Sequence, residues 1–440
     1  MSLAAHPARP VPAAARGAGR LSAGALVGLC LTATFAISVT QILLGVALAA
    51  LLVHLATARD PRAWAVGLEG PLLALLLWAV AMVPLSGDRA QSALFLRRFY
   101  LFAALFIAAG AVRGAAGARV RRWALIALLA GGAGTALYGL VGYARTGGAF
   151  VDAWDGYLKN RVVLTQNYMT AGGLMMVTCL VALAFLLVAR PRRGRLLVAA
   201  AALPMAAALL LTLTRSAWLG FGAGAVVMMA MTRHRLALGA MALGLAALLL
   251  LPGLVRDRFL SAFDPANYQN TPRLVMWGVG LEVVADHPWT GVGDRNLNEL
   301  YWAYRERAAG APVSREAYPG GPVLAVGHLH NNVLQVAAIW GLPGLALVVV
   351  LMVALWRRLR AVWRGLRTAA VAQDDPAPPE GWVLAAMGVW WGFVVAGMFE
   401  WYFGDAEVAL LAWLVSGLAL GADRLAAARA AGGASPPQSA

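Results

Sequence analysis

Long apolar stretches recur along the whole chain of 440 residues, separated by shorter polar segments. Each stretch has roughly the 20 residues that an α-helix needs to cross a hydrocarbon layer about 30 Å thick. Because the stretches are continuous rather than alternating, they favour a helical bundle over a β-barrel. The pattern predicts an all-α polytopic membrane protein with about twelve spanning helices, near residues 21–36, 39–57, 67–86, 99–113, 123–143, 165–189, 196–214, 216–232, 236–255, 333–356, 382–399 and 408–423.

The composition supports this class of protein. Hydrophobic residues make up 61% of the chain and charged residues 13%, whereas a soluble domain rarely exceeds half apolar. The two cysteines, Cys30 and Cys179, both fall inside predicted spans. We therefore expect them to be packing residues, with no disulfide framework.

Basic residues orient the predicted spans. They cluster in polar segments that share one side of the membrane if the amino terminus is cytoplasmic, and cytoplasmic loops carry an excess of Lys and Arg. That side has 22 basic and 6 acidic residues, and the other side has 14 of each. The net charge of +16 is therefore a signal of topology. We expect no nucleic-acid partner, because the clusters flank spans and no soluble domain is predicted.

This topology divides the chain into five parts. A disordered tail (1–20) and a second tail (424–440) are predicted to be cytoplasmic. Spans one to nine lie within 21–255, and spans ten to twelve within 333–423. Residues 256–332 form one large outer segment between them. A loop of this length without structure would be unusual, so we expect a partly helical periplasmic loop that carries function.

Two arginines of the outer face are candidates for binding an anion. Arg273 follows Thr271, a plausible helix N-cap, and Pro272, which suits the first helical position, so it falls in the first turn. A cation there opposes the helix dipole unless an anion lies beside it; the alternative is a surface arginine that reaches toward lipid headgroups. Arg215 lies between two spans with almost no loop, where it faces either a polar cavity or the headgroups.

The densest polar cluster is "GHLHNN", residues 327–332, at the amino end of the tenth predicted span. Asn331 or Asn332 can cap that helix. A helix N-terminus disfavours imidazolium, so a histidine there is held neutral and can act as a general base. The alternative is a cap-and-turn cluster whose histidines bond to backbone groups. Zinc is disfavoured, because two histidines two apart without cysteine or carboxylate partners give an incomplete site.

Three segments resemble one family. "GHLHNNVLQVAAIWGLPGL" resembles the H-x-H-N-x-x-L…G-x-x-G signature of the O-antigen ligase/polymerase superfamily of bacterial envelope glycosyltransferases. "RLVMWGVGLEVVADHPWTGVG" is similar to the superfamily's R-x-x-x-W…P-x-x-G-x-G segment, and "TLTRSAWLG" to its T-x-[ST]-R-[GS]-x-W segment. All three occur in the family's order, and the span count and the large outer loop match as well.

The resemblance implies that a glycan is moved from undecaprenyl diphosphate at the periplasmic face of the bacterial inner membrane. In the ligase the acceptor is a sugar of the lipid A–core, in the polymerase another carrier-linked glycan, and in the protein O-oligosaccharyltransferases a Ser or Thr side chain. Polymerases often have two large outer loops, and the oligosaccharyltransferases an extra soluble segment near the carboxyl end. One dominant outer loop favours the ligase, with a carrier-linked donor, a lipid A–core acceptor and membrane lipids as partners.

The resemblance also suggests which residues bind the donor. Its diphosphate is a good leaving group, so the reaction needs charge stabilisation more than acid catalysis. Arginine suits a diphosphate because it makes bidentate contacts with phosphate oxygens. Arg215 and Arg273 are the first candidates for binding the diphosphate, and Arg161 and Arg145 are the next. Asn331 is a further candidate for substrate binding.

One residue must take the proton of the acceptor hydroxyl. The family's "HN" pair aligns with His330–Asn331, so His330 is the expected base and His328 the second candidate. Direct attack would invert the anomeric centre. The outer face has no D-x-D pair, so we expect no metal and no other cofactor. A transporter is the alternative of another class, but it would need paired charges inside the spans, which are nearly free of acids.

We predict that tags near residues 193 and 362 are cytoplasmic and that a tag near residue 310 is periplasmic, because arginine-rich segments stay in the cytoplasm. Labelling of each tag in intact cells with a membrane-impermeant reagent measures this. A tag on the opposite side at any of the three positions contradicts the topology.

Overall fold

The computed structural model describes residues 12–58, 64–113, 116–151, 158–188, 192–234, 253–264, 270–294, 296–310, 328–367 and 377–432, and positions 239, 250 and 375. Most of this part is helical, and eight helices in it are long and apolar enough to cross a membrane. The predicted all-α polytopic membrane protein is therefore confirmed. The large loop before α14 is partly helical, as predicted.

The first half of the chain contributes helices α1 (Ala13–Thr32), α2 (Ile37–Ala58), α3 (Glu69–Met82), η2 (Val83–Leu85), α4 (Arg89–Phe95), η3 (Leu96–Phe102), α5 (Ala103–Arg113), α6 (Gly117–Thr146), α7 (Tyr168–Val188), α8 (Arg192–Leu211) and α9 (Arg215–Thr232). Two short antiparallel strands, β1 (Ala149–Val151) and β2 (Leu158–Asn160), form a hairpin between α6 and α7.

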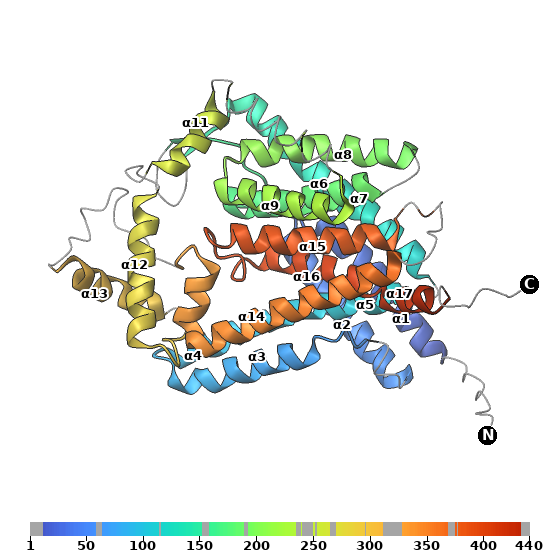
Figure 1. Cartoon of the computed structure of the whole chain (residues 1–440), viewed down its shortest axis with the longest axis horizontal. Coiled ribbons are helices and arrows are strands. Elements are labelled where there is room, and N and C mark those ends of the chain that lie inside the picture. The colour runs from blue at the N-terminus through green and yellow to red at the C-terminus, as the bar shows by residue number, and fades with distance from the viewer. Residues whose placement is uncertain are drawn as a thin grey trace, which may run out of the picture.

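The second half contributes α11 (Leu254–Leu260), η4 (Ser261–Phe263), α12 (Thr271–Asp286), α13 (Asn296–Ala309), α14 (Asn332–Arg367), α15 (Pro379–Ala396), α16 (Ala406–Leu420) and α17 (Asp423–Gly432). In Figure 1, α12 runs across one end of the bundle, while α17 lies at the opposite end.

Eight of the twelve predicted spans correspond to the eight candidate spans. The predicted spans 21–36 and 216–232 are the helices α1 and α9, which are not among those eight, and 67–86 is a shorter apolar helix. The predicted span 236–255 lies mostly outside the described residues. The tail predicted over 1–20 needs correction, since α1 begins at Ala13. Its first turns are rich in alanine, the strongest helix former.

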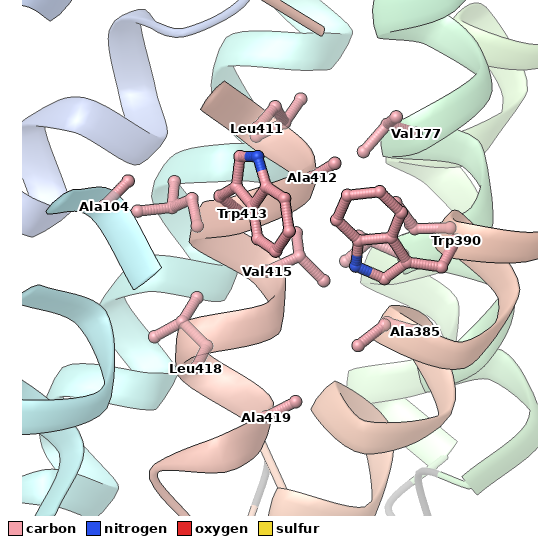
Figure 2. Packing of buried hydrophobic residues seen from close by; sticks show 14 of the residues in the cluster. Ala104, Val177, Ala385, Trp390, Leu411, Ala412, Trp413, Val415, Leu418 and Ala419 are labelled. Atoms are coloured by element: carbon pink, nitrogen blue, oxygen red, sulfur yellow. The ribbon is translucent and has the colours of Figure 1, made fainter. Parts of the chain in front are cut away.

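Three helices, α7, α15 and α16, form the most deeply buried part of the bundle. Trp390 of α15 packs against Trp413 of α16, with ring centroids 4.5 Å apart (Figure 2). The indole N–H of Trp390 donates to Ser416 Oγ at 2.6 Å. An unsatisfied N–H in this apolar interior would cost free energy, so the bond fixes the orientation of the Trp390 ring.

Helices α9 and α15 approach each other through glycines. Gly220 and Gly224 on α9 face Gly392 and Gly388 on α15, and a Cβ at Gly220 would lie 2.6 Å from the carbonyl oxygen of Gly392. Both helices thus carry a G-x-x-x-G pattern, which lets the backbones of membrane helices pack closely. The pairing is antiparallel, so the start of α9 meets the end of α15.

A kink in α14 fixes the position of α12. Gly341 has φ 69° and ψ −179°, a conformation that is essentially restricted to glycine. The turn after α12 hydrogen-bonds to this kink: Val292 N donates to Ala338 O at 2.8 Å, and Leu342 N donates to Pro288 O at 2.7 Å. The end of α12 is therefore held against α14 by backbone bonds.

We predict that Gly341→Ala lowers the free energy of unfolding by about 1–3 kcal/mol, the usual cost of such a backbone conformation. The new Cβ would also come within 2.5 Å of the Trp289 backbone. Thermal unfolding in detergent measures the change. Gly134→Ala in α6 is the control, because nothing lies within 4 Å of its Cβ position. Equal melting temperatures for Gly341→Ala and the wild-type protein would contradict the role of the kink.

Candidate active site

The polar cluster of the chain lies where α12 crosses the bundle. It is built from residues 328–331 before α14, residues 397–405 between α15 and α16, and the first turns of α9 and α12. Backbone bonds join the first two segments, since Asn332 N donates to Gly397 O at 2.6 Å. The Asn332 side chain accepts from Phe403 N at 3.3 Å. The second asparagine of the "HNN" sequence thus ties the two segments together.

Asn331 caps α14, as predicted. Its Oδ1 accepts from Val333 N at 2.9 Å and from Leu334 N at 3.0 Å. Its Nδ2 donates to Met398 O at 3.0 Å. The observed contacts make Asn331 a structural residue that holds the end of α15 against the start of α14, and its expected contact with substrate stays a prediction.

Leu329 anchors the segment that carries both histidines. Its side chain is fully buried, and its backbone N–H donates to Gln335 Oε1 at 2.6 Å. Its carbonyl accepts from Trp277 Nε1 of α12 at 3.0 Å. His330 adopts a left-handed backbone conformation, with φ 47°. Its ring meets that of His328, with centroids 4.1 Å apart.

His330 is hydrogen-bonded to a buried carboxylate. Its Nδ1 lies 2.8 Å from Glu400 Oε1, and the Trp401 backbone N–H donates to the same oxygen at 3.1 Å. Burial raises the pKa of Glu400, but the charge of His330, its hydrogen bond and Arg273 more than offset this, so the pKa lies well below its usual range. Glu400 is thus a carboxylate that accepts, and Nδ1 of His330 donates to it. The proton-free nitrogen of a neutral His330 is then Nε2.

His328 has the opposite tautomer. The backbone N–H of His330 donates to its Nδ1 at 3.3 Å, so the proton of the neutral ring is on Nε2. Burial, together with the charge of His330, lowers the pKa of His328 to about 3. His328 is therefore neutral near pH 7, as predicted for a histidine of this cluster. The cause is burial and neighbouring charge rather than the helix dipole alone.

Arg273 lies in the first turn of α12, as predicted. Its Nη2 is 3.7 Å from Glu400 Oε2. The helix begins at Thr271, one residue earlier than predicted, so Asn270 rather than Thr271 is its N-cap, and Pro272 lies in its first turn. Arg273 therefore points into the cluster, where a carboxylate already faces it, and not away toward lipid.

Arg215 is buried at the start of α9, outside the eight candidate spans. It donates to Ser261 Oγ at 3.2 Å and to Asn270 Oδ1. Burial and the nearby charges of Arg273 and Arg161 lower the pKa of Arg215 to about 10, so it stays positive near pH 7. These contacts show that Arg215 lies among polar partners of the loop segment before α12 rather than reaching toward the headgroups.

The structure separates the two remaining arginine candidates. Arg161 is buried, with its guanidinium 4.2 Å from the centre of the Tyr168 ring, and its charge acts on Arg215. Arg145 is exposed in the last turn of α6 and is not among the charges that act on Arg215. Its expected role in binding an anion stays a prediction without support from these contacts.

Two residues of the cluster, Glu400 and Arg98, were not predicted from the sequence. Glu400 comes directly after the predicted span 382–399, in the aromatic segment "MFEWYF", and a lone acid in such surroundings is a usable signal. Arg98 acts electrostatically on His328 and donates to the Gly404 carbonyl. Only its place in an outer loop pointed to it.

Three side chains of the cluster come close enough to hold a metal ion. Ligand atoms of His328, His330 and Glu400 all lie within 4.8 Å of one another. However, both Nδ1 atoms are engaged in hydrogen bonds, and Arg273 and Arg98 make the surroundings positive. The residues fit a hydrogen-bonded pair next to an anion site better than a site for a cation.

Three guanidiniums lie within electrostatic reach of one another beside the histidines. Arg273 faces Glu400, and Arg273 and Arg161 both act on Arg215. Like charges held together in a poorly hydrated site repel one another unless an anion joins them. The arrangement therefore favours a ligand with two or more negative charges.

Comparison with known proteins finds one family model that matches a central segment of the chain. Residues 200–349 match the family model described as O-Antigen ligase. This segment is therefore similar to the O-antigen ligase family. The resemblance found in the sequence is thereby confirmed, and the matched segment contains Arg215, Arg273 and both histidines. The chain matches no curated protein.

We predict that Arg215→Ala and Arg273→Ala each weaken the binding of a polyprenyl diphosphate by roughly 1.5–3 kcal/mol, the worth of a charge-assisted hydrogen bond. Lysine at either position should restore binding only in part, since its ammonium group cannot make the bidentate contact of a planar guanidinium. Calorimetric titration in detergent measures the affinity. Arg195→Ala, exposed at the other end of α8, is the control. Wild-type affinity in both lysine variants would show that neither arginine makes a bidentate contact with the diphosphate.

Proposed function

We propose that the protein is an O-antigen ligase. It transfers a glycan from undecaprenyl diphosphate to a sugar of the lipid A–core at the periplasmic face of the bacterial inner membrane. The observation that carries the proposal is the pairing of His330 with Glu400 beside three arginines, at one end of a membrane bundle. A base and an anion site are the two parts that such a transfer needs.

The arginines act on the leaving group. When the bond between the anomeric carbon and the diphosphate breaks, the leaving oxygen gains negative charge. Arg215 and Arg273 would stabilise that charge, with Arg161 behind Arg215. Because the site is largely buried, fixed positive charges act there more strongly than in water.

His330 acts on the acceptor. Its Nε2, the nitrogen without a proton, accepts the proton of the acceptor hydroxyl as the oxygen attacks the anomeric carbon. The carbon–oxygen bond to the diphosphate breaks as the new glycosidic bond forms, so the anomeric centre is inverted. Glu400 holds the imidazole through Nδ1, in the way that a carboxylate orients the histidine of a catalytic triad.

His328 has a different part in the reaction. Its Nε2 carries the proton, and its low pKa keeps the ring neutral. A neutral N–H donor next to the base can donate to the oxygen of the acceptor hydroxyl and orient it. The two tautomers thus favour His330 as the base and His328 as the orienting residue.

An apolar groove beside the site supports a lipid-linked substrate. It lies between α14 and α15 and has a volume of about 310 Å³. Its lining along α14 begins at Asn332, two residues after His330, and continues past Val336 and Met352 to Leu359. The groove therefore connects the polar cluster with the apolar flank of the bundle, where the isoprenoid chain of a carrier can lie.

The charge distribution supports a periplasmic site. Helix α8 begins with basic residues and ends next to Arg215, while α14 begins next to His330 and ends with basic residues. The basic ends of both helices thus lie away from the cluster. Since basic segments favour the cytoplasm, the cluster would face the periplasm.

The proposal is tested with purified protein, a carrier-linked glycan and lipid A–core, without ATP and with EDTA. Transfer to the core, unchanged by EDTA, is the expected result. Growth of the glycan on the carrier would instead make the protein a polymerase, and transfer to Ser or Thr of a protein would make it an oligosaccharyltransferase. Inhibition by EDTA that added divalent ions reverse would contradict metal independence. Movement of the glycan-linked lipid across the membrane without transfer would indicate a transporter.

We predict that His330→Ala lowers turnover by about 10²–10⁴-fold, the usual contribution of a positioned base, while donor binding survives. His328→Ala should have a milder effect. Turnover is normalised to folded protein, and donor affinity is measured on the same sample. His234→Ala, at the exposed end of α9, is the control. Wild-type turnover in folded His330→Ala would end this assignment.

A further inference from the structure

The two oxygens of Glu400 face different parts of the site. Oε1 lies 2.8 Å from His330 Nδ1 and accepts from the Trp401 backbone at 3.1 Å. Oε2 is buried and has no hydrogen-bond partner among the described residues. Its nearest cation is Arg273, with Nη2 at 3.7 Å. That separation is too long for a hydrogen bond, so charge alone holds Arg273 there.

We propose that Glu400 is a positioning residue that couples binding of the donor's diphosphate to the action of His330. Oε1 holds the imidazole of His330 in place, and Oε2 attracts Arg273 as long as no diphosphate is bound. When the diphosphate binds, Arg273 contacts its oxygens instead. The inference rests on the proposed function, because it identifies the anion held by the arginines with the donor's diphosphate.

Arg273 is shared between two anions. In the structure it faces Glu400, but a diphosphate offers it two oxygens in a bidentate arrangement, which is the stronger contact. Once Arg273 turns to the diphosphate, Glu400 loses a cationic partner. A buried carboxylate needs a counter-charge, so Glu400 then stabilises more strongly the positive charge that forms on His330 while it accepts the proton of the acceptor hydroxyl. Glu400 thus supports the base most when the donor is in place.

Of three other charged or titratable groups around His330, two have partners or charge states that the diphosphate does not change. His328, in the same segment, is neutral. Arg98, from η3, acts on His328 and is engaged with the Gly404 carbonyl. Arg273, from α12, is the neighbour that also lies among the anion-binding arginines. It is therefore the one of these three groups that can change its partner when the diphosphate binds.

Glu400→Gln separates this coupling from a merely structural role. The glutamine keeps a hydrogen-bond acceptor for His330 but removes the negative charge. We expect turnover to fall at least about ten-fold. Affinity for polyprenyl diphosphate without glycan should stay equal to that of the wild-type protein or increase two- to three-fold, because Arg273 no longer has a competing partner. A structural role predicts that both quantities fall together or that neither changes.

A second readout does not depend on transfer. The effects of Glu400→Gln and Arg273→Ala on affinity for polyprenyl diphosphate should be non-additive, because both substitutions act on the same ion pair. Calorimetric titration of the two single variants and the double variant measures this, and additive effects would contradict the sharing of Arg273. If the wild-type protein transfers no glycan to any acceptor, the proposed function fails, while non-additive diphosphate affinities would still support the coupling.

Two further variants complete the experiment. Glu380→Gln changes a buried glutamate at the other end of α15 and should leave turnover and diphosphate affinity unchanged. Glu400→Asp keeps the charge but shortens the side chain. It is the variant that tests the positioning role if Glu400→Gln does not fold. It should retain diphosphate affinity and lose turnover about three- to ten-fold. Wild-type turnover in folded Glu400→Gln, or joint loss of turnover and diphosphate affinity, overturns the proposal.

Discussion

A negative charge at the end of an apolar bundle is the constraint on which the site depends. The carboxylate of Glu400 is buried, and removing such a group from water costs several kcal/mol unless charged and hydrogen-bonding partners replace the water. Its partners come from distant parts of the chain: His330 precedes α14, Arg273 lies on α12, and the Trp401 backbone belongs to its own segment. The fold must hold all three within a few ångströms of one another.

The packing of the bundle meets this requirement. Glycines bring α9 against α15, which places the start of α9, with Arg215, at the end of α15 that leads to Glu400. The two asparagines tie the segment of Glu400 to the start of α14. The kink at Gly341 receives the turn after α12 and so fixes the helix that carries Arg273. These contacts are made by glycines, backbone groups and asparagine side chains, so none of them uses a charged side chain.

Sequence reasoning succeeded where local rules decide the structure. The cap by Asn331 and the place of Arg273 in the first turn of α12 follow from preferences of neighbouring residues. Glu400 was not predicted as a site residue, because its importance lies in a contact with a residue 70 positions away. The same limit applies to Arg161 and Arg145, which look equivalent in the sequence. The fold buries the first near Arg215 and leaves the second exposed. His328 and His330 likewise have different tautomers because their Nδ1 atoms have different hydrogen-bond partners, which the sequence does not reveal.

The central claim is that one end of the bundle holds a diphosphate beside a carboxylate-bound histidine. A structure of the protein with polyprenyl diphosphate tests it most directly. We expect both phosphates among Arg161, Arg215 and Arg273, with the isoprenoid chain in the groove between α14 and α15. The bond between His330 Nδ1 and Glu400 should persist, while Arg273 should lie farther from Glu400 than its present 3.7 Å. Diphosphate bound away from these arginines, or a broken His330–Glu400 bond, would contradict the account.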